Sequence, residues 1–199
     1  MARRSDHSRE ELVALIIAAG HRHMAEVGFA RFSSRQVAKA IGYSVGTLYN
    51  MFGSYDRLVA AINTRTFGLW ADWLEERLAG NPADRIAALV EGYFSFAAHN
   101  THIWMAIYDH RLPPDMSMPE GYAEQRGVLS ALVTREIAAV LPPAQAENAA
   151  RLARSLIATV HGHCTFALNG SFALMGEDDP LALAIARVRE TLGAAGARL

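Results

Sequence analysis

One stretch near the N-terminus, residues 28–58, constrains this chain most, because it has the pattern of two short helices joined by a tight turn. Ser33 and Ser44 are each suited to cap the N-terminus of a helix, and Gln36 completes the spacing of a capping box with Ser33. Gly42 is suited to the turn, since glycine readily adopts the left-handed conformation that ends helices. The helix after Ser44 spans barely two turns, so its neighbours must hold it in place. The pattern predicts a helix-turn-helix.

The residues of this stretch also resemble those of a known family. Gly28 and Phe29 stand at the end of the preceding helix, and further matching positions follow in order and without gaps. These positions are Val37, Ala38, Gly42, Ser44, Gly46, Thr47, Leu48, Tyr49, Phe52 and Leu58. Over about the first third of the chain, they resemble the DNA-binding region of TetR-type (tetracycline-repressor-like) transcriptional regulators. Tyr55 departs from the family pattern, which usually has a lysine there that meets a DNA phosphate; tyrosine brings one donor but no charge.

The resemblance implies which side chains face DNA. The expected contacts are Ser34, Arg35, Val45, Gly46, Thr47, Tyr49, Asn50, Met51 and Tyr55. The chemistry of these residues agrees, because the Arg35 guanidinium can bind a guanine edge or a phosphate. The methyl groups of Val45 and Thr47 can contact a thymine methyl. Tyr49 and Tyr55 can donate hydrogen bonds to phosphates.

Composition and charge limit the class of protein. Of the 199 residues, 51% are hydrophobic and 20% are charged, which is typical of a globular chain. The net charge is −1, but residues 1–57 carry eight basic and five acidic side chains, a net +3, which leaves −4 for the remainder. The single cysteine, Cys164, excludes an intramolecular disulfide. Because no apolar run is long enough to span a membrane and no secretory signal is recognisable, we expect a cytoplasmic protein.

Helical periodicity continues along the whole chain, and no segment shows convincing strand alternation. Asn81 and Pro82 are suited to be the N-cap and first residue of one of the later helices. Helices are expected over about 9–27, 33–41, 45–51, 54–78, 82–97, 101–108, 120–141, 144–169 and 180–192. The sequence therefore predicts an all-α fold of about nine helices. A three-helix head at residues 1–55 would bind DNA, and residues 56–199 would form a larger effector-binding and dimerisation body.

The body contains more aromatic side chains than a small helical core needs. Helical bundles place ligand pockets between helices and line them with such residues, and TetR-like regulators usually bind a small effector there. The candidate pocket residues are Trp70, Trp73, Tyr93, Phe94, Trp104, Tyr108 and Phe166. Plain core packing is the competing interpretation, and it must hold for most of them.

The last long helices are expected to pair two copies of the chain. A run of small residues over 146–153 would let helix backbones approach closely. The predicted interface residues are Leu152, Ala153, Leu156, Val160, Leu181, Ile185 and Val188. The resemblance implies a homodimer on double-stranded DNA, whose palindromic operator has half-sites about one helical turn apart.

Histidine and cysteine side chains raise the question of a metal site. His99, His102 and His110 lie near one another in sequence, and His161, His163 and Cys164 form a second group. Such side chains can bind zinc or copper. However, His161 and His163 point to different helix faces and no HxxxH pair occurs, so structural histidines are the favoured interpretation. We expect no metal and no cofactor.

Motifs of catalysis are missing from the sequence. It has no GxGxxG, P-loop, HExxH or di-iron Glu-x-x-His pattern, so no enzymatic activity is expected. The sequence predicts a homodimeric repressor that leaves its operator when a small apolar or aromatic effector binds the body. An activator of the same fold is an open alternative, as is a small helical enzyme or carrier with an incidental helix-turn-helix. Salt-dependent binding to a palindrome would separate a regulator from a carrier.

Overall fold

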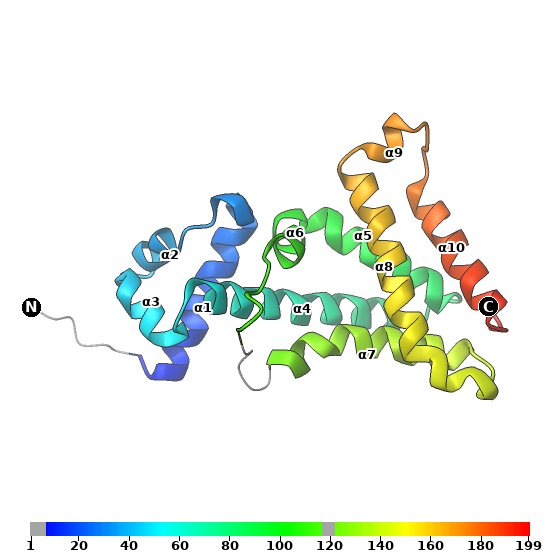
Figure 1. Cartoon of the computed structure of the whole chain (residues 1–199), viewed down its shortest axis with the longest axis horizontal. Coiled ribbons are helices and arrows are strands. Elements are labelled where there is room, and N and C mark those ends of the chain that lie inside the picture. Colours follow the sequence, from blue (N-terminus) through cyan, green and yellow to red (C-terminus); the bar gives the residue numbers. More distant parts are fainter. Residues whose placement is uncertain (1–6, 117–121) are drawn as a thin grey trace, which may run out of the picture. The chain divides into compact units, whose positions relative to one another are not determined.

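The computed structural model describes residues 7–116 and 122–199, and this part of the chain folds into helices joined by turns (Figure 1). The α-helices are α1 (Arg9–Val27), α2 (Ser34–Ala40), α3 (Val45–Phe52), α4 (Tyr55–Ala79), α5 (Arg85–His99), α6 (Thr101–Asp109), α7 (Tyr122–Val140), α8 (Ala149–Leu168), α9 (Ser171–Leu174) and α10 (Pro180–Ala194). Two 3-10 helices, η1 (Phe29–Arg31) and η2 (Pro143–Asn148), precede α2 and α8.

The all-α prediction is confirmed. The described residues contain ten α-helices, nine of them at least seven residues long, and no strand. The expected start of one helix at 120 lies outside the described residues, which resume at Tyr122. None of the described helices is both long and apolar enough to cross a membrane.

The helices form two compact units. The first comprises the described residues of 1–67 and 100–125, and the second comprises 68–99 and 126–199. The first half of α4 and all of α6 therefore fold with the helix-turn-helix, although the sequence suggested a boundary after residue 55. The functional division into residues 1–55 and 56–199 stays a prediction.

Helix caps show where local sequence determines the first unit. Ser8 and Glu11 form a full capping box before α1: the Ser8 amide donates to Glu11 Oε2 (2.7 Å), and the Glu11 amide donates to Ser8 Oγ (3.2 Å). At α2, Ser33 Oγ accepts from the Gln36 amide (3.4 Å), but no return bond from the Gln36 side chain forms among the described residues. The capping box predicted there is thus only half formed. Gly42 has a φ of 75°, as the predicted turn requires.

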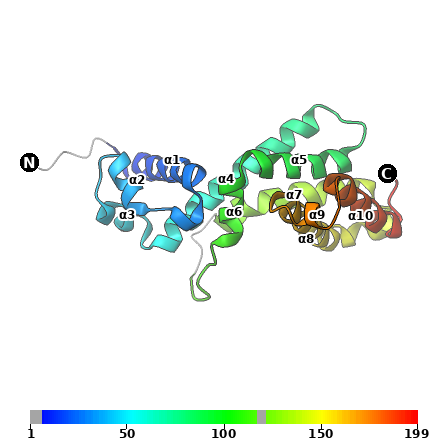
Figure 2. The same cartoon turned by 90° about the horizontal axis from the view of Figure 1, so that it is seen from above.

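Helices α1 to α3 pack with the first half of α4 around one apolar core (Figure 2). The large side chains of this core that have no exposed surface include Ile16, Met24, Leu48, Leu58 and Ile62. Leu48 and Phe52 are the buried residues of α3, as their spacing predicted. The short α3 is therefore held by burying one side, which leaves its other side toward solvent.

Helix α6 is fastened to this first unit by polar contacts. His102 Nδ1 donates to the Ala25 carbonyl oxygen of α1 (2.7 Å), and His110 Nε2 donates to Asp56 Oδ1 at the start of α4 (3.0 Å). Between them, Asn63 Nδ2 donates to the Ala106 carbonyl oxygen (3.0 Å). Both histidines thus serve as structural donors.

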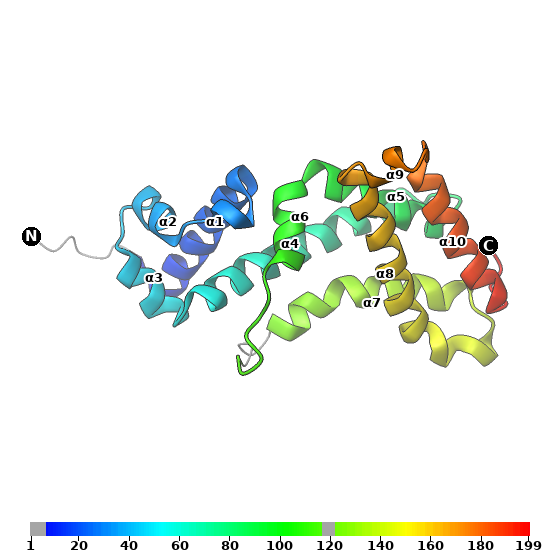
Figure 3. The ribbon, with the colours of Figure 1, turned by 45° about the horizontal axis from the view of Figure 1, so that its top comes forward.

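The second unit has an aromatic core and closely packed helices. In Figure 3, α8 and α10 lie beside each other, and both contact α5. Trp70 is fully buried, stacks on Phe96 with ring centroids 5.2 Å apart, and meets Tyr93 edge-on at 4.6 Å. A Cβ at Gly92 would lie 2.5 Å from Leu74 Cδ2, so glycine is what lets α4 and α5 approach there.

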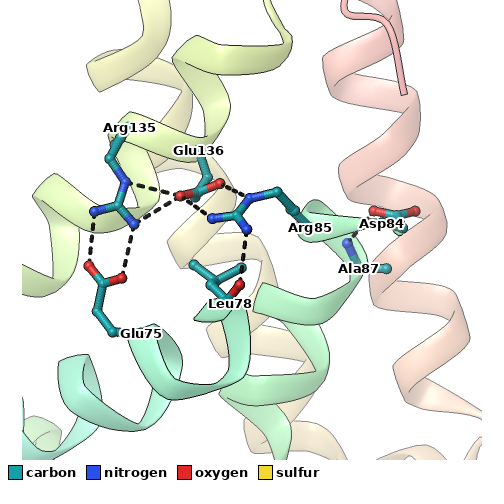
Figure 4. Close-up of polar contacts among 7 residues, drawn as sticks. All are labelled: Glu75, Leu78, Asp84, Arg85, Ala87, Arg135 and Glu136. Atoms are coloured by element: carbon teal, nitrogen blue, oxygen red, sulfur yellow. Dashed lines mark hydrogen bonds and ion pairs between the residues drawn. The ribbon is translucent and has the colours of Figure 1, made fainter. Parts of the chain in front are cut away.

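Ion pairs connect α4, α5 and α7 (Figure 4). The Glu136 side chain is only 6% exposed and receives bonds from Arg85 Nε (2.7 Å) and Arg135 Nη2 (2.9 Å). The Arg135 guanidinium also binds Glu75 through both of its terminal nitrogens, at 2.9 and 3.2 Å. Arg85 Nη1 donates to the carbonyl oxygen of Leu78, near the end of α4 (3.0 Å). The buried carboxylate is therefore paired on both sides.

The start of α5 corrects a prediction. The expected N-cap Asn81 has a φ of 51° and lies outside the helix, which begins at Arg85. Asp84 takes the capping role because its Oδ1 accepts from the Ala87 amide (2.8 Å), and its carboxylate also pairs with Arg189 of α10. A charged cap with a tertiary partner outweighs the Asn-Pro signal.

We predict that Glu136→Gln lowers the free energy of unfolding by about 1–3 kcal/mol at pH 7, because it removes a charged acceptor from two arginines. The guanidinium groups of Arg85 and Arg135 hold the pKa of Glu136 below its usual value, although burial opposes them. Its contribution is therefore present above the pKa of an unfolded glutamate, about 4.3, and is lost as the pH falls through the lower folded pKa. Urea unfolding of wild type and variant between pH 7 and pH 3 measures this.

Glu75→Gln is the matched control, because it removes the same charge from a side chain that is half exposed and bonded only to Arg135 among the described residues. Its effect should be about 0.5 kcal/mol or less. Equal losses for the two variants would contradict a special role for the buried carboxylate.

Candidate functional site

The helix-turn-helix is fixed internally by two hydroxyl groups. Ser34 Oγ and Tyr49 Oη lie 2.9 Å apart and share a hydrogen bond between the start of α2 and the middle of α3. Ser34 is only 8% exposed, while Tyr49 is half-buried. Two of the predicted DNA contacts are thus engaged with each other, and Ser34 positions Tyr49.

The N-terminus of α3 is capped as predicted. Ser44 Oγ accepts from the Thr47 amide (3.1 Å) and lies 2.9 Å from Thr47 Oγ1. The Thr47 hydroxyl therefore has its partner at the N-cap of its own helix.

The predicted DNA residues differ in how far they reach solvent. Arg35, Gly46 and Asn50 are exposed, whereas Thr47 is half-buried. Three others, Val45, Met51 and Tyr55, are half-buried and pack against the core of the first unit. Arg35 and Asn50 thus present their side chains to solvent, whereas the packing of Val45, Met51 and Tyr55 helps to hold α3 and the start of α4 in place.

Tyr55 stands at the first residue of α4. Its ring centroid lies 6.0 Å from that of Phe32. Burial, with a smaller effect from the charge of Asp56, raises the pKa of Tyr55. The hydroxyl is therefore a neutral donor at pH 7, and the ring is part of the packing.

Sequence reasoning did not include Lys39 in the DNA surface. Lys39 is exposed on α2, four residues after Arg35, so the two cations share one face of the helix. Neither forms an ion pair with any residue that the structure describes. The i, i+4 spacing of the two basic residues is the signal that could have found it.

The second unit contains an apolar cavity of about 50 Å³. Its lining residues are Leu74, Ile86, Leu89, Val90, Tyr93, Leu129, Val133, Ile137, Leu156, Ile157, Val160 and Val188. They come from α4, α5, α7, α8 and α10, and none is charged. Among the seven aromatic residues predicted to line a pocket, only Tyr93 lines this cavity.

The other six predicted pocket residues lie elsewhere. Trp70 is buried in the aromatic core, and Trp73 Nε1 donates to Ser95 Oγ (3.3 Å). Phe94 is half-buried and Phe166 is 46% exposed. The remaining pair, Trp104 and Tyr108, belongs to the first unit. The structure therefore does not bring the seven together, because the aromatic residues pack mainly on one another while aliphatic side chains surround the cavity.

The predicted dimer interface needs correction. Ala153, Leu156, Val160 and Val188 are buried within the second unit itself, and the last three line the cavity. The three other predicted residues, Leu152, Leu181 and Ile185, are half-buried. Four of the seven predicted residues thus belong to the unit's own core, whereas a role of Leu152, Leu181 and Ile185 in an interface stays a prediction.

A different face of α8 is open to solvent. Ser155, Ala158, Gly162 and Phe166 are exposed and recur at intervals of three and four residues. A Cβ at Gly162 would meet nothing within 4 Å, so the fold of this unit does not itself require a glycine there.

The histidines and the cysteine have structural surroundings. His161 Nδ1 shares a hydrogen bond with Tyr93 Oη (3.1 Å), and burial lowers the pKa of His161. His163 Nδ1 donates to the Thr159 carbonyl oxygen (2.8 Å). Burial raises the pKa of Cys164 to about 12, so its thiol stays protonated at pH 7. Among residues 7–116 and 122–199, no group of three His, Cys, Asp or Glu side chains is placed to hold a metal ion.

Known proteins resemble this chain in sequence. A family model described as "Tetracyclin repressor-like, C-terminal domain" matches residues 86–190, and one described as "Bacterial regulatory proteins, tetR family" matches residues 16–62. An uncharacterised HTH-type transcriptional regulator of Mycobacterium tuberculosis is 34% identical over 87 residues. That match covers 44% of this chain and 45% of the relative, so the chain spans just under half the length of the curated relatives it matches.

Solved structures share the fold at lower identity. A protein of unknown function from Rhodococcus sp. RHA1 superposes with a TM-score of 0.68 at 22% identity, covering 96% of both chains. The multidrug binding protein EbrR, complexed with imidazole, gives 0.62 at 19% identity over 93% of this chain and 95% of that one. A TetR transcription regulator from Haloarcula marismortui gives 0.58 at 18% identity over 93% and 98%. Because one family model spans more than half of the chain and the other covers its helix-turn-helix, the protein belongs to the TetR family, whose members are DNA-binding transcriptional regulators and not enzymes.

Proposed function

We propose that this protein is a homodimeric repressor that binds a palindromic operator and leaves it when a small apolar effector binds the second unit. The observation that carries the proposal is the exposed face of α2 and α3. There, Arg35, Lys39 and Asn50 face solvent from two short helices that the Ser34–Tyr49 bond holds together. A fixed pair of helices with free donors is what base reading in a major groove needs.

These side chains fall into two groups, those suited to recognise bases and those suited to contact phosphates. A guanidinium such as that of Arg35 can bind guanine O6 and N7 together, and an amide such as that of Asn50 can bind adenine N6 and N7. Lys39 and the hydroxyl of Tyr55 are suited to phosphates, which fix the register without reading sequence. The positive charge of the first 57 residues favours the approach to DNA.

Two heads are needed because α3 has only eight residues and reaches few base pairs. Dimerisation makes the second contact intramolecular and raises the avidity. We place the interface on the exposed face of α8, at Ser155, Ala158, Gly162 and Phe166. Small residues at its middle would let the α8 of a second copy approach closely.

Charge supports an antiparallel pairing of α8 with its copy. Arg151 and Arg154 are exposed at the start of the helix, and the acidic residues Glu177 and Asp178 follow beyond its other end. A two-fold axis near Ala158 would bring the basic end of one copy toward the acidic end of the other, as an isologous interface requires.

The effector is proposed to act by widening the apolar cavity. A cavity of about 50 Å³ is smaller than the roughly 150 Å³ that accommodates benzene, so a ligand must displace the lining helices. Leu74 brings α4 into that lining, and α4 continues without a break to Tyr55 behind the reading helix. A ligand that prefers the widened state would weaken operator binding by its coupling free energy, typically about 1–3 kcal/mol. The fold shared with EbrR, a multidrug binding protein, supports a small-molecule effector.

Selection of bound duplexes from a random DNA pool tests the proposal. The expected product is a two-fold symmetric sequence with half-sites about one helical turn apart. A transcription assay on that operator, with and without toluene as an uncharged apolar probe, then separates repression from activation. An asymmetric consensus, or no enrichment at all, would contradict the two-headed repressor.

Arg35→Ala should weaken operator binding by about 1–3 kcal/mol, because a bidentate contact to a base is lost. The loss should depend on the base at one operator position, as measured by titrating operator variants. Arg22→Ala is the control, because it removes the same charge from a residue that is exposed on α1, outside the predicted DNA surface. A loss that is equal on all sequences would instead identify Arg35 as a phosphate contact.

Tyr49→Phe and Ser34→Ala should each lower the free energy of unfolding by about 0.5–1.5 kcal/mol, because each breaks the same hydrogen bond. The double variant should lose little more than either single one, which chemical denaturation of all four proteins measures as a coupling free energy. Strictly additive losses would mean that the two hydroxyl groups act independently.

Ala158→Arg should convert the dimer to a monomer with much weaker operator binding, as read by size-exclusion chromatography with light scattering and by DNA titration. Ala131→Arg, which adds the same side chain at an exposed site on α7, should remain dimeric. Ala153→Arg is unsuitable because Ala153 is buried and the variant would disturb the unit itself. A dimeric Ala158→Arg protein would place the interface elsewhere.

A further inference from the structure

A groove in the first unit has no role in the function proposed above. It has a volume of about 250 Å³ and lies among α1, α4 and the first residues of α7. It shares no lining residue with the apolar cavity of the second unit or with the predicted DNA surface. Its volume is below the roughly 300–1,000 Å³ of pockets for drug-sized ligands, so any occupant is small.

One side of the groove is apolar. Ala14 and Ile17 lie one turn apart on α1, and Ala61 faces them from α4. Ile17 packs against the core of the first unit, and Ala61 is part of that core. This side can therefore cover the hydrocarbon part of a ligand but offers it no hydrogen bond.

The other side of the groove presents donors. The Arg65 side chain lines it and is exposed, and it has no ion pair with any residue in 7–116 or 122–199. Tyr122 adds a hydroxyl, and burial raises the pKa of Tyr122, which keeps that group a donor at pH 7. Gln125 adds an exposed amide, and no lining residue is acidic. This combination favours a ligand with one negative charge.

A buried histidine near Arg65 can serve as a reporter for the groove. His21 follows Ile17 by one turn on the same face of α1, and its Nε2 is buried with no hydrogen-bond partner among the described residues. Burial, together with the charge of Arg65, lowers the pKa of His21 to about 4, so the imidazole is neutral at pH 7. Because Nε2 is closed to solvent and His21 does not line the groove, the ring does not contact a ligand there, but it would report a charge bound at Arg65.

We propose that this groove is a second ligand site, which binds a small monocarboxylate with an apolar body. The Arg65 guanidinium binds the carboxylate through two nitrogens, the geometry in which arginine and carboxylate match best. Tyr122 donates to the same group, and the apolar body lies on Ala14, Ile17 and Ala61. An uncharged ligand of equal size leaves Arg65 without its partner and binds more weakly.

Titration of the full chain with sodium benzoate, and separately with benzamide, tests the site. Benzoate is expected to give saturable shifts in the NMR signals of α1 and of the His21 ring, and benzamide is expected to bind at least about tenfold more weakly, as loss of a charged hydrogen bond implies. Arg65→Met should weaken benzoate binding by a similar factor, and Tyr122→Phe should weaken it severalfold.

Arg22→Met is the matched control, because Arg22 is exposed on α1, one of the helices that border the groove, and does not line the groove. It should bind benzoate as wild type does, and thermal unfolding checks that each variant is folded. The proposal is overturned if wild type does not bind benzoate, if benzamide binds equally well, or if Arg22→Met loses as much as Arg65→Met. Operator binding is measured on the same samples, so a failure of this site is distinguished from a failure of the repressor proposal.

Discussion

The carboxylate of Glu136 is the group on which the second unit most depends. A charge that is almost removed from water is unfavourable unless partners surround it, and Glu136 has Arg85 on one side and Arg135 on the other. The network shares helical turns with the cavity lining, because Glu75, Arg85 and Glu136 are each next in sequence to a lining residue, namely Leu74, Ile86 and Ile137. The ion pairs hold together the same turns of α4, α5 and α7 that surround the apolar space. An effector that widened the cavity would therefore act against this network.

The first unit is held together by an apolar core and by histidine hydrogen bonds, in contrast to the ion-pair network of the second unit. Its core is apolar, but α6 is fastened by His102 and His110, which each donate to one acceptor on another helix. These bonds, together with the burial of Ile103 and Ala106 in the same core, explain why α6 folds with the helix-turn-helix although more than 30 residues separate it from that motif in sequence. They also give two of the histidines a structural reason to be present, which is the interpretation that the sequence favoured.

The sequence was informative where structure is local and ambiguous where it depends on distant partners. Caps such as Ser33 and Ser44, the turn at Gly42 and the two buried positions of α3 could be predicted because each depends on residues within one or two turns. The start of α5 could not, since Asp84 is selected over Asn81 partly by a partner on α10, more than 100 residues away. The same limit explains the predicted interface. Val160 and Ala158 both lie on α8, and only the packing of α5 and α10 decides which of them is buried.

The two proposed ligand sites would select their ligands by different properties, one by size and the other by charge. The lining of the cavity is apolar, and such a surface distinguishes ligands mainly by size, at about 1–3 kcal/mol per methylene. It would therefore accept many uncharged ligands of similar volume. The groove beside Arg65 would select by charge, because an uncharged ligand leaves the Arg65 guanidinium without an ion-pair partner. Ile17 and Ala61 also contribute to the packing of the first unit. A ligand in the groove would therefore directly contact α1 and α4, the helices that pack against the helix-turn-helix.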